Sequence, residues 1–134
     1  MSQNLPLVSV IIPAYNAEQF VLESVNSALA QTYGNFEVIV VNDGSTDKTL
    51  DILNKISDSR LKVISLKNSG QCAAANQGLR LAKGEFIKFL DADDLINNCH
   101  LEEMVKIATK HTGALVLCKW ARFYSSIEDA KFIY

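Results

Sequence analysis

The sequence has little of what secreted and membrane proteins require. It contains only three cysteines, Cys72, Cys99 and Cys118, and none of them forms a C-x-x-C pair. This odd, scattered set predicts a reduced, cytoplasmic protein without structural zinc. The N-terminal segment has no basic region and no apolar run close to the roughly 20 residues that span a bilayer, so we expect neither a signal peptide nor a membrane helix.

An excess of charge of one sign is also missing. The 13 Lys and Arg residues nearly balance the 15 Asp and Glu residues, and the formal net charge is -2. No basic run could neutralise a row of phosphates, so nucleic acid is excluded as an expected partner. With 49% hydrophobic and 21% charged residues, the chain of 134 residues is expected to fold around one buried core.

Glycine-rich phosphate loops are absent as well. Neither G-x-G-x-x-G nor G-x-x-x-x-G-K-[ST] occurs in the sequence, and dinucleotide-binding and P-loop proteins depend on these patterns. The negative charge of a diphosphate ligand would therefore have to be neutralised by another group. A divalent metal held by carboxylate oxygens is the simplest one.

Apolar patterns of two kinds alternate along the chain. Short, continuous, β-branched runs predict buried strands at residues 8–12, 36–41, 61–66, 85–90 and 114–120. Helical spacing predicts a first helix capped by Asn16 and ended by Gly34, and further helices at 46–57, 72–82 (with Gly84 in the C′ position) and 101–109. The alternation predicts an α/β, Rossmann-like fold, in which helices cover both faces of a mostly parallel sheet.

The whole chain, residues 1–134, is expected to form a single domain, because no linker, repeat or low-complexity segment divides it. Its last residues, 130–134, are mostly apolar and carry no terminating signal, which favours a chain shortened inside a larger domain. Such a chain is expected to expose apolar surface and to self-associate.

Polar residues follow each of the first four predicted strands. In open α/β sheets, ligands bind outside the carboxyl ends of the strands, where the strand order reverses. The loops that we expect to meet in one crevice are Pro13-Ala14-Tyr15-Asn16, Asn42-Asp43-Gly44-Ser45, Asn68-Ser69-Gly70 and Asp91-Ala92-Asp93-Asp94.

The acidic loop 91–94 has two interpretations. In an extended segment, the side chains of Asp91 and Asp93 point the same way and Ala92 leaves room between them, so both carboxylates could face one metal ion. The alternative is a solvated turn, in which Asp94 stabilises the N-terminus of the next helix.

Asp43 and Tyr15 are each open to two interpretations. Asp43 either accepts hydrogen bonds from a ribose or base, or forms an Asx turn or helix cap. Tyr15 either stacks on a base or covers the edge of the sheet. Asn68 and Gly70 are expected to be turn residues.

Structural roles are expected for the remaining chemically distinctive residues. His100 and His111 are expected at the surface or at helix ends, and the three cysteines and Trp120 in the core. Glu128 and Asp129 are expected to be a solvated acidic pair.

Several motifs occur together in a specific order. They are VSVIIPAYN (8–16), VNDGSTD (41–47), NSG (68–70), Ala74 with NQG (76–78), AKGE (82–85) and FLDADD (89–94). The combination resembles the nucleotide-sugar-binding half of family 2 glycosyltransferases, which have the GT-A fold. The resemblance extends from about residue 7 to residue 111, which is most of the chain.

The resemblance implies a donor-binding site and a metal site. Asp43 would contact the base and Asp91 the ribose, and Asp93 of the D-x-D motif would bridge Mg2+ or Mn2+ to the donor diphosphate. The substrate-binding residues that it implies are Pro13, Tyr15, Asn16, Asp43, Asp91 and Ala92.

The implied activity is the transfer of a sugar from a nucleoside diphosphate sugar, by family habit a UDP-sugar, to a hydroxyl group of an acceptor glycan, lipid or protein. This is a reaction of polysaccharide biosynthesis, expected in the cytoplasm or at the inner face of a membrane. A divalent metal stabilises the diphosphate as it leaves. A general base, usually Asp or Glu, takes the proton of the acceptor hydroxyl.

The sequence departs from the family pattern in two ways. Ala75 stands where an arginine is usual, and Arg80 lies further on, at a different angle around the helix. The family's catalytic base lies in a second, acceptor-binding half, and Glu128-Asp129 follows Asp94 too soon to supply it. The chain by itself is therefore expected to bind a donor without turnover.

Two alternative functions remain open at this point. One is a Mg2+-dependent nucleotidyl- or phosphotransferase, which would consume a nucleoside triphosphate. The other is a non-catalytic interaction domain, in which the acidic residues only cap helices and no metal-dependent ligand binds.

Overall fold

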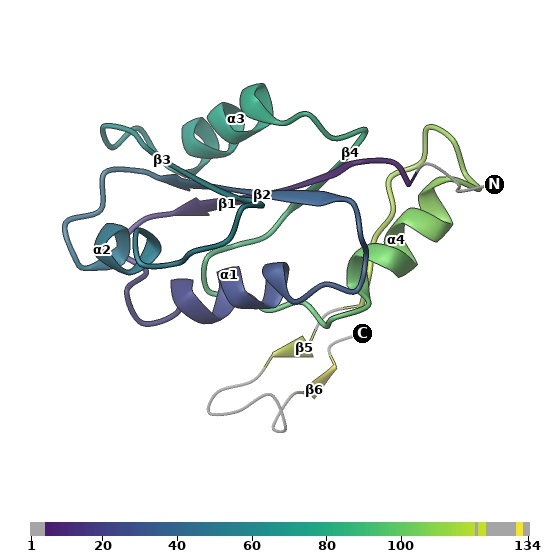
Figure 1. Cartoon of the computed structure of the whole chain (residues 1–134), viewed down its shortest axis with the longest axis horizontal. Helices are drawn as coiled ribbons and strands as arrows, with labels where there is room; N and C mark the ends of the chain where they lie inside the picture. The colour runs from purple at the N-terminus through teal and green to yellow at the C-terminus, as the bar shows by residue number, and fades with distance from the viewer. Residues whose placement is uncertain (1–4, 120, 123–130, 133–134) are drawn as a thin grey trace. The chain divides into compact units, whose positions relative to one another are not determined.

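The computed structural model describes residues 5–119, 121–122 and 131–132. The chain divides into two compact units, Met1–Glu103 and Met104–Tyr134. The first unit contains a four-stranded parallel sheet with the order β3-β2-β1-β4 (Figure 1), which confirms the expected Rossmann-like α/β fold. Its strands are β1 (Val8–Ala14), β2 (Phe36–Asn42), β3 (Leu61–Ser65) and β4 (Phe86–Phe89).

Helices cover both faces of this sheet. The helix α3 (Gln71–Leu81) lies on one face, whereas α1 (Val21–Leu29) and α2 (Thr49–Leu53) lie on the other (Figure 1). After β3 the chain returns past β1 to form β4, so the strand order reverses between β1 and β4. Further along, α4 (His100–Ala108) crosses from the first unit into the second, where β5 (Ala121–Arg122) and β6 (Lys131–Phe132) form a short antiparallel pair.

The strand β1 is the centre of the core, and all of its residues are buried. The β-branched residues 10–12 are fully buried, as a parallel strand covered on both faces requires. On one face α3 packs closely, because a Cβ at Gly78 would collide with the side chain of Ile11. On the other face, the buried residues of α1 are Val21, Ser24, Val25 and Ala28.

The first four predicted strands are confirmed, but the fifth is wrong. Residues 114–119 form no strand, and Leu115 and Leu117 are 85% and 79% exposed. An apolar run becomes a buried strand only where a neighbouring strand and a covering layer are available, and the run itself does not show this. Trp120 and the pair Glu128-Asp129 lie outside the described residues.

Several predicted helix ends are also wrong: α1 ends at Leu29 and not at Gly34, and α2 covers Thr49–Leu53 and not 46–57. The helix α1 begins at Val21, well after Asn16, and Asn16 has a φ of 46° instead of the β-region backbone of an N-cap. Gly84 has no positive φ and is not the C′ residue of α3, whose C-cap is Ala82. A Cβ at Gly84 would lie 2.5 Å from the backbone nitrogen of Ser9, so glycine lets the chain pass close to β1.

The expectation of buried cysteines is not met. Cys72 and Cys118 are exposed, Cys99 is half-buried, and all three are free. The buried residues of α3 are Ala74 and Gly78, which leaves Cys72 outside the packed face. Small size and low polarity allow a cysteine to be buried, but the helix face on which it falls decides whether it is.

The two histidines differ from one another. His111 is exposed and His100 is the first residue of α4, so both are at the surface or a helix end as expected, but His100 is buried. Its Nε2 has no hydrogen-bond partner among the described residues. Burial, and secondarily the charge of Lys88, lower the pKa of His100, although Glu103 opposes this shift.

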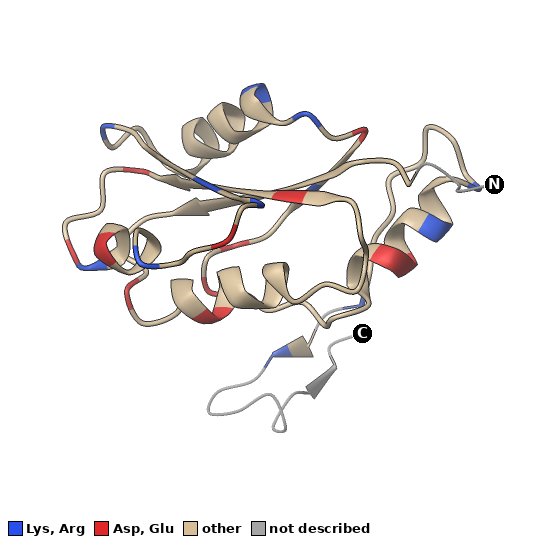
Figure 2. Ribbon diagram, viewed as in Figure 1, with Lys and Arg blue, Asp and Glu red and all other residues tan. Residues whose placement is uncertain are grey.

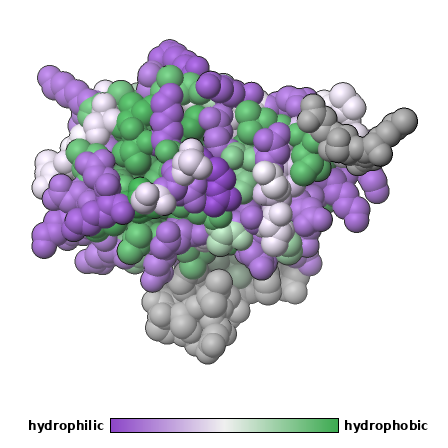
Figure 3. Space-filling view, in the orientation of Figure 1, coloured by the Kyte–Doolittle hydropathy of each residue, from purple (hydrophilic) through white to green (hydrophobic). Residues whose placement is uncertain are grey.

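The surface of the described residues is mixed in character. Figure 3 shows apolar patches broken up by polar residues on the face in view. Lys and Arg are spread over several helices and loops, as Figure 2 shows. No described helix has both the length and the apolar character needed to cross a membrane.

Candidate functional site

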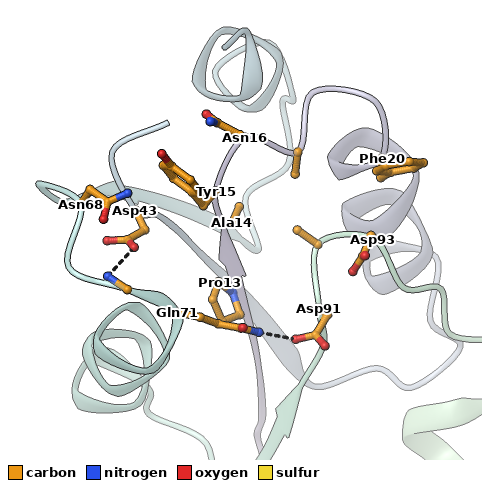
Figure 4. Close-up of a pocket in the computed structure, with 13 residues that line it drawn as sticks. Pro13, Ala14, Tyr15, Asn16, Phe20, Asp43, Asn68, Gln71, Asp91 and Asp93 are labelled. Atoms are coloured by element: carbon orange, nitrogen blue, oxygen red, sulfur yellow. Dashed lines mark hydrogen bonds between the residues drawn. The ribbon is translucent and has the colours of Figure 1, made fainter. Parts of the chain in front are cut away.

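A cavity of about 610 Å³ lies in the first unit, at the carboxyl ends of the strands. It is placed where the strand order reverses, as expected for an open α/β sheet. The structure brings all seven of the expected donor and metal residues to this one cavity (Figure 4). The lining residues are Pro13, Ala14, Tyr15, Asn16, Ala17, Phe20, Asp43, Asn68, Gly70, Gln71, Asp91, Ala92 and Asp93.

The loop after β1 is fastened to the loop after β2. The backbone N–H of Asn16 donates to Ser45 Oγ at 3.0 Å, and Asn16 Oδ1 accepts from the backbone N–H of Thr46 at 2.8 Å. One residue later, the N–H of Ala17 donates to Thr49 Oγ1 at 2.8 Å. Asn16 thus holds the two loops together with its left-handed backbone and its side chain, and the adjacent Tyr15 remains exposed at the cavity.

Asp43 links the end of β2 to the loop after β3. The residue is only 2% exposed. Its carboxylate accepts hydrogen bonds from the backbone N–H groups of Ser69 and Gly70, each at 2.8 Å. Asp43 therefore forms neither an Asx turn within its own loop nor a cap of α2, but joins two strand ends. Each carboxylate oxygen can accept a further hydrogen bond, so a ligand in the cavity could still use it.

The acidic residues after β4 form a turn and not an extended segment. The N–H of Asp94 donates to the carbonyl oxygen of Asp91 at 3.0 Å, which closes the turn. The expectation of an extended segment, in which alternation points Asp91 and Asp93 the same way, is therefore wrong. The turn nevertheless places both residues in the cavity lining.

The two cavity-lining acids of this turn have different surroundings. Asp91 Oδ1 accepts from Gln71 Nε2 at 3.0 Å, across the crevice between β4 and α3 (Figure 4). Within the described part of the chain, no hydrogen bond or ion pair holds the exposed Asp93 carboxylate. Partial burial, followed by the charges of Asp93 and Asp91, raises the pKa of Asp94.

The cavity lining is negatively charged. It contains three carboxylates, those of Asp43, Asp91 and Asp93, and neither Lys nor Arg. Among the described residues, no group of three or more His, Cys, Asp or Glu side chains is arranged to hold a metal ion alone. Any metal at this site would therefore take further ligands from a bound molecule or from water.

Gln71 and Phe20 are lining residues that the strand-end pattern did not single out. Gln71 is the first residue of α3 and directly follows the loop 68–70, so the strand-end rule could have found it. Phe20 precedes α1 and is exposed, and no local pattern marks it. Ala75 and Arg80 are not among the residues that line the cavity.

A parallel sheet with its cavity at the strand switch point defines the class of open α/β proteins that bind ligands at the strand ends. Residues 9–132 match the family described as "Glycosyl transferase family 2". The chain belongs to family 2 of the glycosyltransferases.

Individual relatives agree with this family. The chain is 46% identical over 112 residues to the Escherichia coli UDP-Glc:alpha-D-GlcNAc-diphosphoundecaprenol beta-1,3-glucosyltransferase WfaP, a match that covers 77% of this chain and 44% of WfaP. The chain spans less than half the length of the first curated relatives that it matches.

Two solved structures share the fold and have ligands. S. aureus TarS 1-349 in complex with UDP-GlcNAc is 35% identical, with a TM-score of 0.70, covering 83% of this chain and 37% of that one. The mannosyltransferase PcManGT from Pyrobaculum calidifontis, in complex with GDP-Man and Mn2+, is 32% identical, with a TM-score of 0.65, covering 69% of this chain and 29% of that one.

Proposed function

We propose that the first unit binds the nucleoside diphosphate sugar donor of a sugar transfer reaction, and that the donor is a UDP-sugar. The observation that carries this proposal is the cavity at the strand switch point, lined by Asp43, Asp91 and Asp93. The name of WfaP and the UDP-GlcNAc in the TarS structure support the choice of uridine.

The nucleoside would lie on the side of the cavity formed by β1 and β2. Pro13, Tyr15 and Asn16 would line its pocket, and the buried Asp43 would accept a hydrogen bond from the base. Asp91 would accept hydrogen bonds from the ribose hydroxyls in place of the one from Gln71. The small Ala92 beside it would leave room for the sugar ring.

The residues present fit a divalent metal at Asp93. Its carboxylate offers hard oxygen ligands, and the cavity lining has no Lys or Arg that could meet the charge of a diphosphate. Mg2+ is commonly held by one or two carboxylates together with substrate phosphates, which suits a site without a larger group of ligands. Mg2+ or Mn2+ bound there would stabilise the negative charge that develops on the departing diphosphate.

The acceptor is a hydroxyl group of a glycan, a lipid or a protein, and its proton must pass to a general base. We assign no residue of this chain to that role. Since the chain spans less than half the length of its curated relatives, we propose that it binds a donor without turnover by itself. The three free cysteines support a location in the cytoplasm, or at the inner face of a membrane.

Self-association is a further part of this proposal. The edge strand β4 exposes Ile87 and Phe89, and apolar side chains on an open sheet edge favour contact with another chain. Sedimentation velocity over a range of protein concentrations tests it. A single monomer boundary at every concentration contradicts self-association but leaves donor binding untouched.

Calorimetric titration of the full chain with UDP, ADP and GDP, each with Mn2+ and with EDTA, tests the donor proposal. We expect UDP to bind most tightly, and Mn2+ to increase its affinity. Equal affinity for the three nucleotides contradicts the assignment of uridine, and binding that EDTA does not weaken contradicts the metal. Incubation with UTP, followed by an assay for released pyrophosphate, tests the alternative of nucleotidyl transfer.

A further inference from the structure

The helix α1 and the residue stretch after it present polar side chains to the segment that contains the acidic turn. Ser24 and Ser27 are three residues apart on one side of α1. Gln31 follows the end of the helix, and its Nε2 donates to the carbonyl oxygen of Ser27 at 3.1 Å, which continues this polar stripe. Ser24 is 0% exposed, and Gln31 is buried as well. Polar side chains that are buried in an apolar core require hydrogen-bond partners.

These three residues find their partners one after another along residues 91–101. Ser24 Oγ donates to the carbonyl oxygen of Asp91 at 3.0 Å. The N–H of Ile96 donates to Ser27 Oγ at 3.3 Å. At the far end, Gln31 donates to the carbonyl oxygen of Asn97 at 2.6 Å and accepts from the N–H of Leu101 at 2.9 Å. The polar stripe therefore holds the connection between β4 and α4 against α1.

The Asp91 carbonyl oxygen is the pivot of the acidic turn. It accepts both the Ser24 hydroxyl and the N–H of Asp94, so its two lone pairs are both used. The second of these bonds closes the turn and fixes the direction of Asp93. The first bond holds the turn to the buried Ser24 of α1. Among the bonds between described residues that hold this segment to α1, the bond from Ser24 is the one made to the turn itself.

Ser24 also behaves differently from Ser27 on the same helix. Serine inside a helix commonly donates to a backbone carbonyl of the preceding turn. Ser27 does this, since its Oγ donates to the carbonyl oxygen of Ser24 at 2.8 Å. Ser24 instead donates outside the helix, to the cavity-lining turn.

We infer that Ser24 is a positioning residue, which holds the acidic turn so that Asp91 and Asp93 face the donor and its metal. The inference rests on the proposed function, because it assigns these two carboxylates to donor and metal. Ser24 does not line the cavity, and its hydroxyl reaches the site only through the backbone of Asp91.

The test compares Ser24→Ala with the matched control Ser27→Ala in the full chain. The first readout needs no ligand: amide hydrogen exchange of Asp94, measured by NMR. We expect Ser24→Ala to accelerate this exchange about fivefold, which is the size of effect that one ordinary hydrogen bond supplies, and Ser27→Ala to leave it within about twofold. Equal exchange of Asp94 in Ser24→Ala and the unchanged protein overturns the inference.

The second readout is the gain in UDP affinity on adding Mn2+. Ser24→Ala should reduce this gain about fivefold, with UDP affinity in EDTA nearly unchanged, whereas Ser27→Ala should reduce neither. An equal loss in both variants, or a parallel loss in EDTA, indicates a general loosening and overturns the positioning role. If the unchanged protein shows no gain from Mn2+, the proposed metal site fails, and Asp94 exchange alone decides on Ser24.

A conservative variant covers the case in which Ser24→Ala does not fold. Ser24→Cys keeps the shape of the side chain, with a somewhat larger sulfur atom, and donates a weaker hydrogen bond. We expect its Asp94 exchange rate and its Mn2+ effect to lie between those of the unchanged protein and complete loss. A Ser24→Cys protein with neither value altered contradicts the inference.

Discussion

The two sides of the cavity are built differently. On the side of β1 and β2, polar side chains are already bound within the protein: Asn16 to the backbone of Thr46, and Asp43 to the N–H groups of Ser69 and Gly70. On the side of β4, the Asp93 carboxylate has no hydrogen bond or ion pair to any described residue, and the turn is held through its backbone. The first side is preorganised, and the second leaves its charge available to a ligand.

The difference agrees with what each side is proposed to bind. A nucleoside is recognised by fixed geometry, and hydrogen bonds within the protein supply it before the ligand arrives. A metal and a diphosphate bring opposite charges of their own, and the acidic side is complete only with them. The following experiments alter one side at a time, and the largest effects come first.

Removing the Asp93 carboxylate should have the largest effect. In Asp93→Ala we expect the gain in UDP affinity from Mn2+ to be lost. Mutating residues that only support a metal ligand lowers metal affinity about 10- to 100-fold, and removing the ligand itself should have at least this effect. The measurement is calorimetry with Mn2+ and with EDTA. Asp94→Ala is the matched control, because Asp94 is in the same turn but does not line the cavity. Full metal dependence in Asp93→Ala refutes the metal assignment.

Asp43→Ala alters the preorganised side. The variant removes a carboxylate that holds the loop 68–70 and would contact the base, so UDP should bind about tenfold more weakly in both Mn2+ and EDTA. Calorimetry under the two conditions measures this. Asp47→Ala offers a control, because Asp47 also accepts backbone hydrogen bonds, from Glu18 and Thr49, but does not line the cavity. If UDP affinity fell only in the presence of Mn2+, Asp43 would act through the metal, and the two sides of the cavity would not bind their ligands independently.

Gln31→Ala loosens the segment on the acidic side. It removes hydrogen bonds with Ser27, Asn97 and Leu101. The carbonyl oxygen of Asn97 and the N–H of Leu101 then lose their Gln31 partner. We expect the free energy of unfolding to fall by about 2 to 3 kcal/mol, measured by denaturation in urea. Gln71→Ala is the control, since Gln71 is exposed and its side chain makes one hydrogen bond, to Asp91. Equal stability of the two variants shows that the polar stripe contributes little.

The pH dependence of stability should show a smaller effect on the same side. The pKa of His100 is lowered from 6.5 in the folded protein, first by burial and then by Lys88. The unfolded chain therefore takes up a proton first, and stability falls as the pH decreases through 6.5. Unfolding in urea at pH values between about 7.5 and 5.5 measures the slope, which His100→Gln should reduce. His111→Gln, at an exposed position, should keep the slope of the unchanged protein.

Much of the first unit could be predicted from the sequence. Runs such as residues 8–12 and 36–41 are apolar on both faces, and this pattern is sufficient to indicate central parallel strands. The strand-end rule then brought Pro13, Asp43 and Asp91 to one crevice without any knowledge of side-chain positions. The family relationship was equally evident, because several weak motifs occur in one order.

Other features could not be read from local pattern. The run at 114–119 looks like a strand but is exposed, and Cys72 is small and apolar but lies on the outer side of α3. Asn16 has the composition of a helix cap, but its contacts with the β2 loop give it a left-handed backbone. In each case the outcome depends on a neighbour that is distant in sequence.

The sequence by itself determined the order of strands and helices, the loops that carry the polar residues, and the family. These follow from hydrophobic periodicity and short motifs, which act over a few neighbouring residues. Only the tertiary structure decided that Asp43 is bound by the loop after β3, that Asp91 to Asp94 form a closed turn, and that Ser24 holds it. The hydrogen bonds of Asp43 and Ser24 join residues 26 to 67 positions apart, and their partners are fixed only when the packed core brings them together.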